Sequence, residues 1–444
     1  MIVALVAVPA AAGLLAFALR WDRPRRALLA MTALAHAGMT VAAWPQLDAT
    51  GRLFLSITSA LFLAAVPYAI DMLRRKENGE AVFTGCLLLF LASMTGVTVT
   101  THFGLLWVAA EATTLASAPL IYFHRDARSL EATWKYLLVC SVGIALALLG
   151  NFFLAGANVD VPLEMHALVR HAATLNVPWL KAAFLCFLVG YGTKMGLAPL
   201  HTWLPDAHSE SPSVVSALLS GALLNCAFVG ILRAVQVCAA AGLASFAQEL
   251  LVLFGLISMG TAAVFILGQP DYKRMLAYSS VEHMGILALG VGLGGAATFG
   301  AMLHALNHSL VKASLFMVAG NLLAAYGTKT SAEVRGALRV APVSGALWIA
   351  GVLAITGFPP FGTFISEFTI LRAALDQGRP VVASIYVALL ALVFVGMTAS
   401  ALPMAQGTSD RPVRRESALS LVSPVLMMAA VLALGVFVPR GFGP

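Results

Sequence analysis

Long apolar segments separated by short polar stretches follow one another along nearly the whole chain. There are about fourteen of them, and most are roughly 18–25 residues long, the length that a helix needs to cross ~30 Å of hydrocarbon. Their positions are 2–19, 27–46, 53–73, 81–100, 103–123, 133–156, 178–200, 213–238, 243–268, 275–294, 297–325, 341–376, 380–404 and 417–438. The pattern predicts an all-α, polytopic membrane protein with about fourteen transmembrane helices.

Two of these segments contain residues that interrupt a helix. The seventh contains Gly196 and Pro199, and the twelfth, which is too long for one straight span, contains Gly357, Pro359 and Pro360. Proline lacks a backbone N–H and glycine tolerates unusual backbone angles, so both helices are predicted to be broken. The broken helices are five apart in the count, which suggests two five-helix repeats of inverted orientation.

This spacing divides the chain into four predicted parts. Residues 1–80 form helices 1–3, residues 81–238 the first repeat (helices 4–8), residues 243–405 the second repeat (helices 9–13), and residues 417–444 helix 14. The first repeat would carry the first broken helix and the second repeat the other.

Composition and charge agree with this picture. Hydrophobic residues make up 60% of the chain and charged residues 11%. Basic residues cluster after odd-numbered helices, so the positive-inside rule places those segments in the cytoplasm and both termini outside. The formal charge of +7 then reflects membrane orientation, not nucleic-acid binding. The cysteines are isolated and form no CxxC pair, so neither an iron–sulfur cluster nor a zinc site is expected.

Once loop residues are set aside, Lys194 and Lys312 are the two basic residues expected inside spans. A charge at the centre of a membrane helix costs about 2.5–3.5 kcal/mol on insertion scales, so such residues usually serve a function. Lys194 lies beside the first break, and Glu111 lies deep in the fifth helix. We expect the two to pair, and opening the pair would lower the proton affinity of the lysine. The alternative is a static ion pair that fixes helix packing.

The eleventh helix carries a polar stripe. His304, His308 and Lys312 are spaced by four residues, so they share one face of a helix. This spacing favours a proton path over satisfied core residues. Metal binding by His304 and His308 is a further alternative, although no third ligand is close in sequence.

Three more ionisable residues lie within predicted spans of the second half. Glu282 and His283, about two to three turns into the tenth helix, either continue a polar path or face a water-filled entrance. Glu367 follows the second break and is expected to exchange protons with one side of the membrane. Its alternative role is a charge favoured by the dipole of the half-helix.

The stretch after the first break is rich in polar residues. His201 lies closest to the break and is assigned to the proton path. Asp206, His208 and Glu210 are interpreted as a rigid polar turn.

The start of the tenth helix is also polar. Its cluster of Asp271, Lys273 and Arg274 is interpreted as interfacial, either solvated or anchoring the helix at the membrane surface.

Four motifs resemble the antiporter-like subunits of respiratory complex I, of membrane-bound hydrogenases and of multisubunit cation/proton antiporters. They are TKMGLAPLHTWLPDAHSESPSVVSALLSGALL, DYKRMLAYSSVEHMG, LNHSLVKASLFMVAGNL and LAITGFPPFGTFISEF. The resemblance covers roughly residues 80–405. It implies fourteen core helices with two inverted repeats, and within the group the sequence looks most similar to the hydrogenase-4 (formate hydrogenlyase) type.

The resemblance also implies roles for matching positions. Glu111 and Lys194 match the family's ion pair, and Glu367 matches the ionisable residue of its twelfth helix. The matches to its central polar axis are His283, His304 and Lys312. One departure is Asn225, which stands where the family often has a lysine in a G-x-L-L-K pattern; an asparagine can hold water but cannot carry a proton.

The resemblance implies a proton-translocating subunit of a redox-driven complex in a bacterial or archaeal cytoplasmic (inner) membrane. We expect no catalytic residue, cofactor or metal in this chain, and partners that are other membrane subunits and, through them, a peripheral redox module. Besides these partners the chain would contact the lipid bilayer and no nucleic acid. The alternatives are a Na⁺(K⁺)/H⁺ antiporter subunit and a proton-inactive scaffold subunit.

Overall fold

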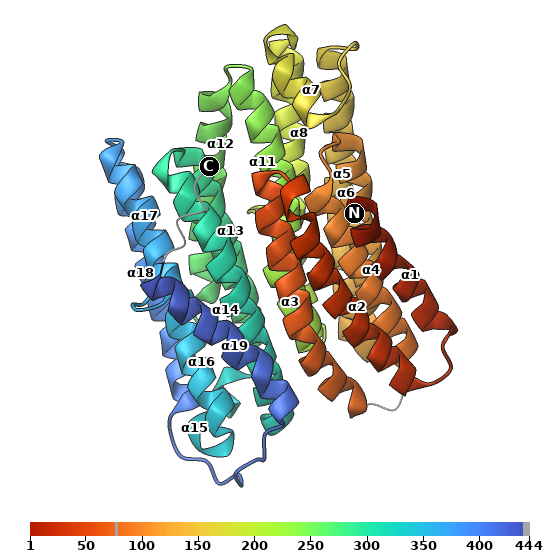
Figure 1. Ribbon diagram of the computed structural model, residues 1–444. Helices are drawn as coiled ribbons and strands as arrows, with labels where there is room; N and C mark the ends of the chain where they lie inside the picture. The colour runs from red at the N-terminus through yellow and green to blue at the C-terminus, as the bar shows by residue number, and fades with distance from the viewer. Residues whose placement is uncertain (76–78, 438–444) are drawn as a thin grey trace. The chain divides into compact units, whose positions relative to one another are not determined.

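The computed structural model describes residues 1–75 and 79–437, and in these ranges the regular structure is helical apart from two isolated β-bridges (Figure 1). Eleven of the described helices are long and apolar enough to cross a membrane, and two shorter apolar helices, Ile2–Ala18 and Pro342–Ile355, accompany them. The prediction of an all-helical membrane protein is therefore confirmed. The count of fourteen spans and the inverted repeats stay predictions.

The helices follow the apolar segments closely. In the first half they are α1 Ile2–Ala18, α2 Asp22–Ala43, α3 Ala49–Arg74, α4 Glu80–Val99, α5 Phe103–Ile121, α6 Ala127–Ala157, α7 Met165–Arg170, α8 Val177–Met195, α9 Leu204–Glu210, α10 Ser213–Leu218, the π-helical turn η4 Leu219–Leu223, and α11 Leu224–Ala240. In the second half they are α12 Ala244–Ile266, α13 Tyr272–Leu293, α14 Ala296–Tyr326, α15 Ala337–Val340, α16 Pro342–Ile355, α17 Gly362–Asp376, α18 Pro380–Ala405 and α19 Ala418–Val436.

Both predicted breaks interrupt their helices at the expected residues. α8 ends at Met195 and α9 begins at Leu204, while α16 ends at Ile355 and α17 begins at Gly362. Gly196 (φ 87°) and Gly357 (φ 69°) have left-handed backbone conformations, which only glycine adopts without steric cost. Each break thus creates two helix ends inside an otherwise apolar segment.

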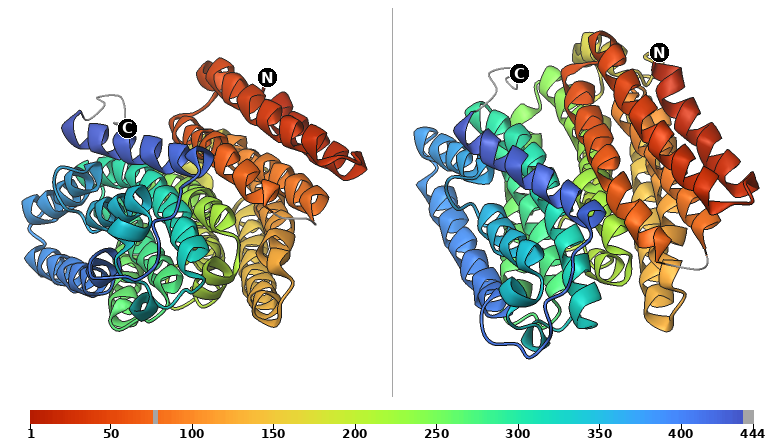
Figure 2. Two further views of the ribbon diagram at one scale, coloured as in Figure 1. Left: turned by 90° about the horizontal axis from the view of Figure 1, so that it is seen from below. Right: turned by 60° about the horizontal axis from the view of Figure 1, so that its bottom comes forward.

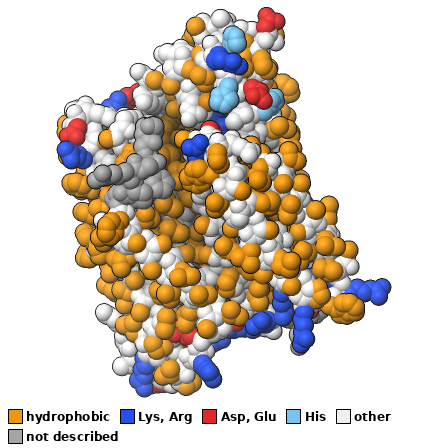
Figure 3. Space-filling view, viewed as in Figure 1, with side chains coloured by type: hydrophobic (Ala, Val, Ile, Leu, Met, Phe, Trp, Pro, Cys, Tyr) orange, Lys and Arg blue, Asp and Glu red, His pale blue; other side chains and the backbone are white. Residues whose placement is uncertain are grey.

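The chain forms two compact units. One comprises Met1–Leu63, Asn78–Trp203 and Ala222–Leu250, and the other comprises Ala64–Glu77, Leu204–Gly221 and Leu251–Pro444. Within each unit the long helices run alongside one another (Figures 1 and 2). Apolar side chains cover most of the face shown in Figure 3, as helix surfaces in contact with lipid require. Large apolar side chains are also exposed on single helices: Leu138 of α6 is 63% exposed and Val264 of α12 is 69% exposed.

In the first unit, small residues let α6 and α8 approach each other closely. A Cβ atom added to Gly190 of α8 would come within 2.7 Å of both the Ala147 nitrogen and the Gly143 carbonyl oxygen of α6. The lipid gives no hydrophobic driving force between helices, so such backbone contacts are a main source of their association.

At the start of α6, hydrogen bonds from the Ser129 backbone N–H and hydroxyl lower the pKa of the capping Asp126 carboxyl.

The first unit also buries polar groups that the sequence did not single out. The His36 ring of α2 is hydrogen-bonded to Ser59 of α3 at 3.0 Å and to Thr95 of α4 at 2.9 Å, which ties three helices together. Arg233, counted above as a loop residue, is 1% exposed on α11 and pairs with Asp48 at 3.3 Å. Because Arg233 lies within α11, the expectation that Lys194 and Lys312 are the two basic residues inside spans is wrong.

In the second unit, α14 is the central helix. It packs against α10, α13, α16, α17 and α19, and α19 crosses over it and α16 (Figure 2). Tyr68, at the end of α3, donates a hydrogen bond to the Met317 carbonyl at 3.0 Å. These neighbours enclose the polar stripe that α14 carries.

We predict that Gly190→Ala destabilises the protein by about 1–3 kcal/mol, because the new methyl group overlaps the backbone of α6. The midpoint of thermal unfolding in detergent, followed by the loss of the monodisperse size-exclusion peak, should fall. Gly38→Ala is the matched control, since a Cβ there meets nothing within 4 Å on an exposed face of α2. Equal midpoints for the two variants would contradict the close packing of α6 and α8.

Candidate functional site

Lys194 is buried in the last turn of α8, at the end created by the first break. It is 1% exposed, and its ammonium group donates hydrogen bonds to the Ala110 carbonyl and, at 2.5 Å, to the Thr114 hydroxyl, both on α5. The negative end of the α8 dipole also favours a cation at this position. The break therefore supplies part of the environment that keeps the charge in place.

Thr114 lies between Lys194 and Glu111. Its hydroxyl donates to one Glu111 oxygen at 3.4 Å, while the other Glu111 oxygen accepts from the Ser141 hydroxyl of α6 at 2.9 Å. The structure thus brings the two predicted charges into one network but joins them through a hydroxyl instead of a direct ion pair. A bridging hydroxyl can accept from the ammonium and donate to the carboxylate at the same time.

The backbone around the first break is held by local hydrogen bonds. The N–H groups of Gly196 and Leu197 both donate to the Gly192 carbonyl, at 2.9 and 2.8 Å, which ends α8 in a closed turn. The Trp203 indole donates to the Thr193 carbonyl at 2.8 Å. His201 is buried in the same break at 6% exposure, and its assignment to the proton path stays a prediction.

Lys312 has an environment of the same kind in the second unit. Its ammonium group donates to the Leu276 carbonyl at 2.6 Å and to the Ser279 hydroxyl, both on α13. Glu282, one turn further along α13, is 2% exposed and interacts electrostatically with Lys312. Lys312 is therefore surrounded in the same way as Lys194, by a carbonyl, a hydroxyl and a carboxylate one turn away.

Three histidines lie next to this lysine site. His283 Nδ1 and His304 Nε2 are hydrogen-bonded at 2.9 Å, and His304 Nδ1 is bonded to the Ser366 hydroxyl at 2.9 Å. The His308 ring centroid lies 5.2 Å from that of His283. The stripe predicted on α14 therefore joins α13 and α17 in a continuous polar cluster.

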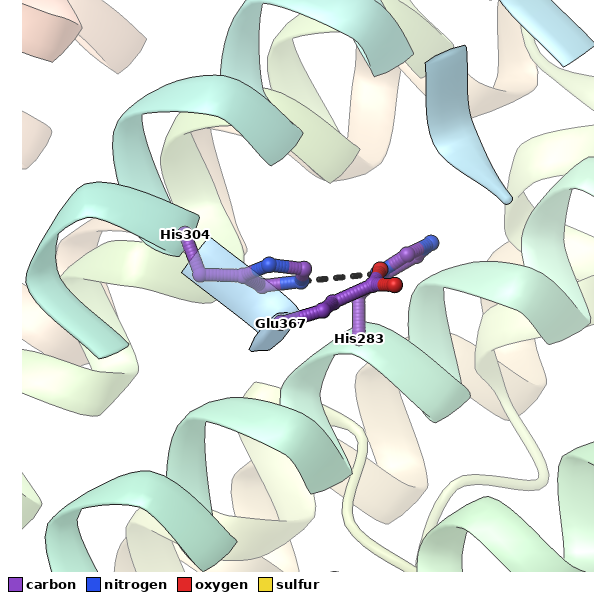
Figure 4. Close-up of side chains that lie close together, drawn as sticks. All are labelled: His283, His304 and Glu367. Carbon is purple, nitrogen blue, oxygen red and sulfur yellow. Dashed lines mark hydrogen bonds between the residues drawn. The ribbon is translucent and has the colours of Figure 1, made fainter. Parts of the chain in front are cut away.

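Glu367 completes the cluster from α17. Its carboxylate folds back against Gly357 in the second break, where a Cβ atom would overlap it. Its Oε1 has no hydrogen-bond partner among the described residues, and no side chain caps α17. His283, His304 and Glu367 bring ligand atoms within 4.8 Å of one another and are the group in the described chain that could hold a metal ion (Figure 4). His304 and His308, the metal pair considered from sequence, are not in that group together.

The polar stretch after the first break is fixed by charges. Asp206 pairs with Arg274, and Glu210 pairs with Lys329 at 2.7 Å; these residues form the short helix α9 and not the turn that we expected. His208 is buried against the Phe316 ring.

Lys273 is not the solvated or anchoring interfacial residue that we expected. It is 1% exposed, and it donates to the Ser209 carbonyl at the end of α9 at 3.1 Å and to the Ser211 carbonyl just beyond it at 2.7 Å. Main-chain carbonyls at a helix end lack intrahelical partners, so the lysine caps α9.

Asn225 is 1% exposed at the start of α11, directly after the π-helical turn Leu219–Leu223. π-helical turns occur often at functional sites and change the direction in which the following side chains point. Nothing in the sequence pattern indicated this turn.

Sequence reasoning missed the hydroxyls that connect the charged residues. Serine and threonine cost little in a membrane helix, so these residues do not stand out in an apolar sequence. They are Thr114, Ser141, Ser279 and Ser366. A usable signal was spacing, because Thr114 lies one turn after Glu111 and Ser279 lies one turn before Glu282.

Comparison with known proteins places these motifs in a family. A family model described as "NADH:quinone oxidoreductase/Mrp antiporter, TM" matches residues 100–394. The "Hydrogenase-4 component F homolog" of Methylacidiphilum infernorum (isolate V4) is 37% identical over 396 residues, which are 87% of this chain and 82% of the relative.

Two solved structures show the same fold. A chain of the membrane-bound sulfane sulfur reductase (MBS), an archaeal respiratory membrane complex, superimposes with a TM-score of 0.90 at 21% identity, covering 98% of this chain and 94% of that one. A chain of the Mrp complex from Dietzia sp. DQ12-45-1b gives a TM-score of 0.88 at 21% identity, with the same coverage of 98% and 94%.

We predict that Lys273→Met lowers the free energy of unfolding by about 1–3 kcal/mol, because it leaves the Ser211 carbonyl without its buried donor. Lys329→Met is the matched control, since that lysine is 22% exposed and such ion pairs contribute about 0–1 kcal/mol. Thermal unfolding of the two purified variants checks the difference. If the Lys329 variant were the less stable of the two, the capping role of Lys273 would be excluded.

Proposed function

Because this chain belongs to the NADH:quinone oxidoreductase/Mrp antiporter transmembrane family, we propose that it moves protons across the membrane as a subunit of a redox-driven complex. The observation that carries the proposal is the network that joins the buried Lys194 through Thr114 to the half-buried Glu111. A charge placed so deeply is costly, which supports a functional role for it.

The Lys194 network can act as a switch. Thr114 and the Ala110 carbonyl are neutral acceptors, so the ammonium depends on Glu111 for a compensating charge. Movement of Glu111 towards Lys194 favours the protonated amine, and movement away favours release of the proton. A small shift of α5 against α8 would therefore be enough to bind a proton and then release it.

The second unit supplies a set of groups for further transfer. An imidazole can take up a proton at one nitrogen and release one from the other, and His283 and His304 are already connected through such a bond. Lys312 and Glu282 repeat the lysine and carboxylate combination of the first unit. Glu367 would be the exchanger nearest the second break. Asn225 cannot carry a proton, so transfer past it would use ordered water.

The redox-driven role is supported by the relatives. One is a homolog of a hydrogenase component, and one structural neighbour belongs to a respiratory complex that reduces sulfane sulfur. We therefore propose other membrane subunits as direct partners and a peripheral redox module reached through them. The host would be the cytoplasmic membrane of a bacterium or archaeon, with both termini outside.

A second candidate is a cation/proton antiporter subunit. The structural likeness to the Mrp complex favours it, as does the buried Glu367 oxygen without a hydrogen-bond partner. If this candidate is correct, transport by vesicles containing the assembled complex should require Na⁺ or K⁺. Proton uptake that is unchanged in cation-free choline buffer would exclude it.

We predict that Lys194→Met and Glu111→Gln each abolish proton uptake by vesicles that carry the assembled complex, measured with a pH-sensitive dye during redox turnover. Neither variant can provide the charge change that the switch needs. Lys181→Met is the matched control on α8, because Lys181 lies over the Phe246 ring, away from the network. Unaltered uptake in both variants would disprove the proton-switch proposal and leave the scaffold role.

Thr114→Val should reduce proton uptake by about tenfold without abolishing it. The change removes the bridge but keeps both charges, and a hydrogen bond to a charged group contributes about 1.5–3 kcal/mol. Thr133→Val on α6 is the control, since its hydroxyl bonds only the Ser129 carbonyl of its own helix. A Thr114 variant as active as the control would show that Lys194 and Glu111 communicate by another route.

A further inference from the structure

Three helices of the second unit bring metal-ligating side chains together in the interior. His283 of α13, His304 of α14 and Glu367 of α17 are all buried, and their ligand atoms lie within 4.8 Å of one another (Figure 4). We propose that this cluster binds one divalent transition-metal ion of the zinc class. The proposal concerns binding alone and does not rest on proton transport.

The donor set selects the class of ion. Two imidazoles and one carboxylate suit zinc and its neighbours, whereas Mg²⁺ and Ca²⁺ prefer oxygen ligands. Zinc sites with three protein ligands keep a fourth position for water. The cluster therefore has the composition of an open site, not of a closed structural one.

The hydrogen bonds around His304 already orient its ring for a metal. The Ser366 hydroxyl donates its proton to the Thr363 carbonyl at 2.7 Å, so its oxygen must accept from His304 Nδ1. That leaves the lone pair of His304 Nε2 facing His283. A hydrogen bond to the second nitrogen is how proteins usually fix a metal-binding imidazole.

His283 can be oriented in the same way. In the metal-free state the proton between His283 Nδ1 and His304 Nε2 belongs to His283. If the metal takes that place, His283 carries its proton on Nε2, which lies 4.0 Å from a Glu282 oxygen. A shift of about 1 Å would bring the Glu282 oxygen within hydrogen-bond distance of Nε2 and complete a carboxylate–histidine–metal triad.

Charge balance supports the assignment. A divalent cation bound by two neutral imidazoles and the Glu367 carboxylate leaves one positive charge, which the nearby Glu282 carboxylate cancels when the Lys312 amine is uncharged. An uncompensated charge would be prohibitive in this interior, whereas a neutral assembly is tolerated.

The geometry needs only a small adjustment. Ligand atoms 2.0–2.1 Å from a tetrahedral zinc ion are about 3.3 Å apart, so the two histidine nitrogens at 2.9 Å must separate slightly. Glu367 must move inward, and its Oε1 has no hydrogen bond to lose among the described residues.

The test uses the full chain, purified in detergent, with Co²⁺ as a spectroscopic probe and Zn²⁺ as competitor. We expect one Co²⁺ per chain, with the visible absorption of a four- or five-coordinate site that Zn²⁺ displaces. His304→Gln and Glu367→Gln should each weaken binding by more than about tenfold. His308→Gln is the matched control, because His308 touches the cluster but is not in the ligand group, and its affinity should be unchanged.

X-ray absorption of the zinc-loaded wild type gives an independent test that does not depend on how the variants fold. Two imidazole ligands with oxygen in the remaining positions are expected. A spectrum with fewer than two imidazoles overturns the proposal. Loss of Co²⁺ binding in His308→Gln, with binding retained in Glu367→Gln, also overturns the proposal. Loss of Co²⁺ binding when the surface residues His166 and His171 are replaced overturns it as well.

Discussion

An ammonium group enclosed by apolar helices must find hydrogen-bond acceptors within the protein, and this requirement shapes both units. Lys194 meets a carbonyl and a hydroxyl four residues apart on α5, and Lys312 meets a carbonyl and a hydroxyl three residues apart on α13. Lys273 binds two carbonyls near the end of α9. In each case neutral dipoles, not carboxylates, make the direct contacts. Buried polar groups without such partners would cost several kilocalories per mole, so the positions of α5, α9 and α13 are tied to their lysines.

Because the direct partners of these lysines are uncharged, the lysines can change their protonation state more easily. A lysine locked against a carboxylate is a stable pair that resists change, because removal of either charge strands the other. A lysine surrounded by a carbonyl and a hydroxyl, with the carboxylate one turn away, can lose its proton and keep its neighbours satisfied. The hydroxyl of Thr114 can reverse its direction, since it both donates and accepts. The arrangement is therefore suited to a charge that varies.

The helices and their breaks could be predicted from the sequence because both depend on local properties. Apolar length sets the spans, and Gly196, Gly357 and the neighbouring prolines interrupt them. The ionisable residues of the site stood out for their cost in lipid. The connections between them did not, because Thr114, Ser279 and Ser366 are inexpensive in a helix and become important only through tertiary contacts. Arg233 and Lys273 escaped notice for another reason: Lys273 lies in the first turn of α13 and Arg233 in the last part of the apolar segment 213–238, where sequence alone cannot separate a solvated charge from a buried one.

Gly357 contributes to the site through an atom that it lacks. The Glu367 carboxylate occupies the space where any other residue would place its Cβ, so the loop that contains Gly357 determines where this carboxylate lies. The position of the carboxylate that α17 carries thus depends on the loop that precedes this helix. A methyl group added at Gly357 would move the Glu367 carboxylate but leave every ionisable residue present. Substitution at this position would therefore change the electrostatic field inside the second unit without removing a charged group.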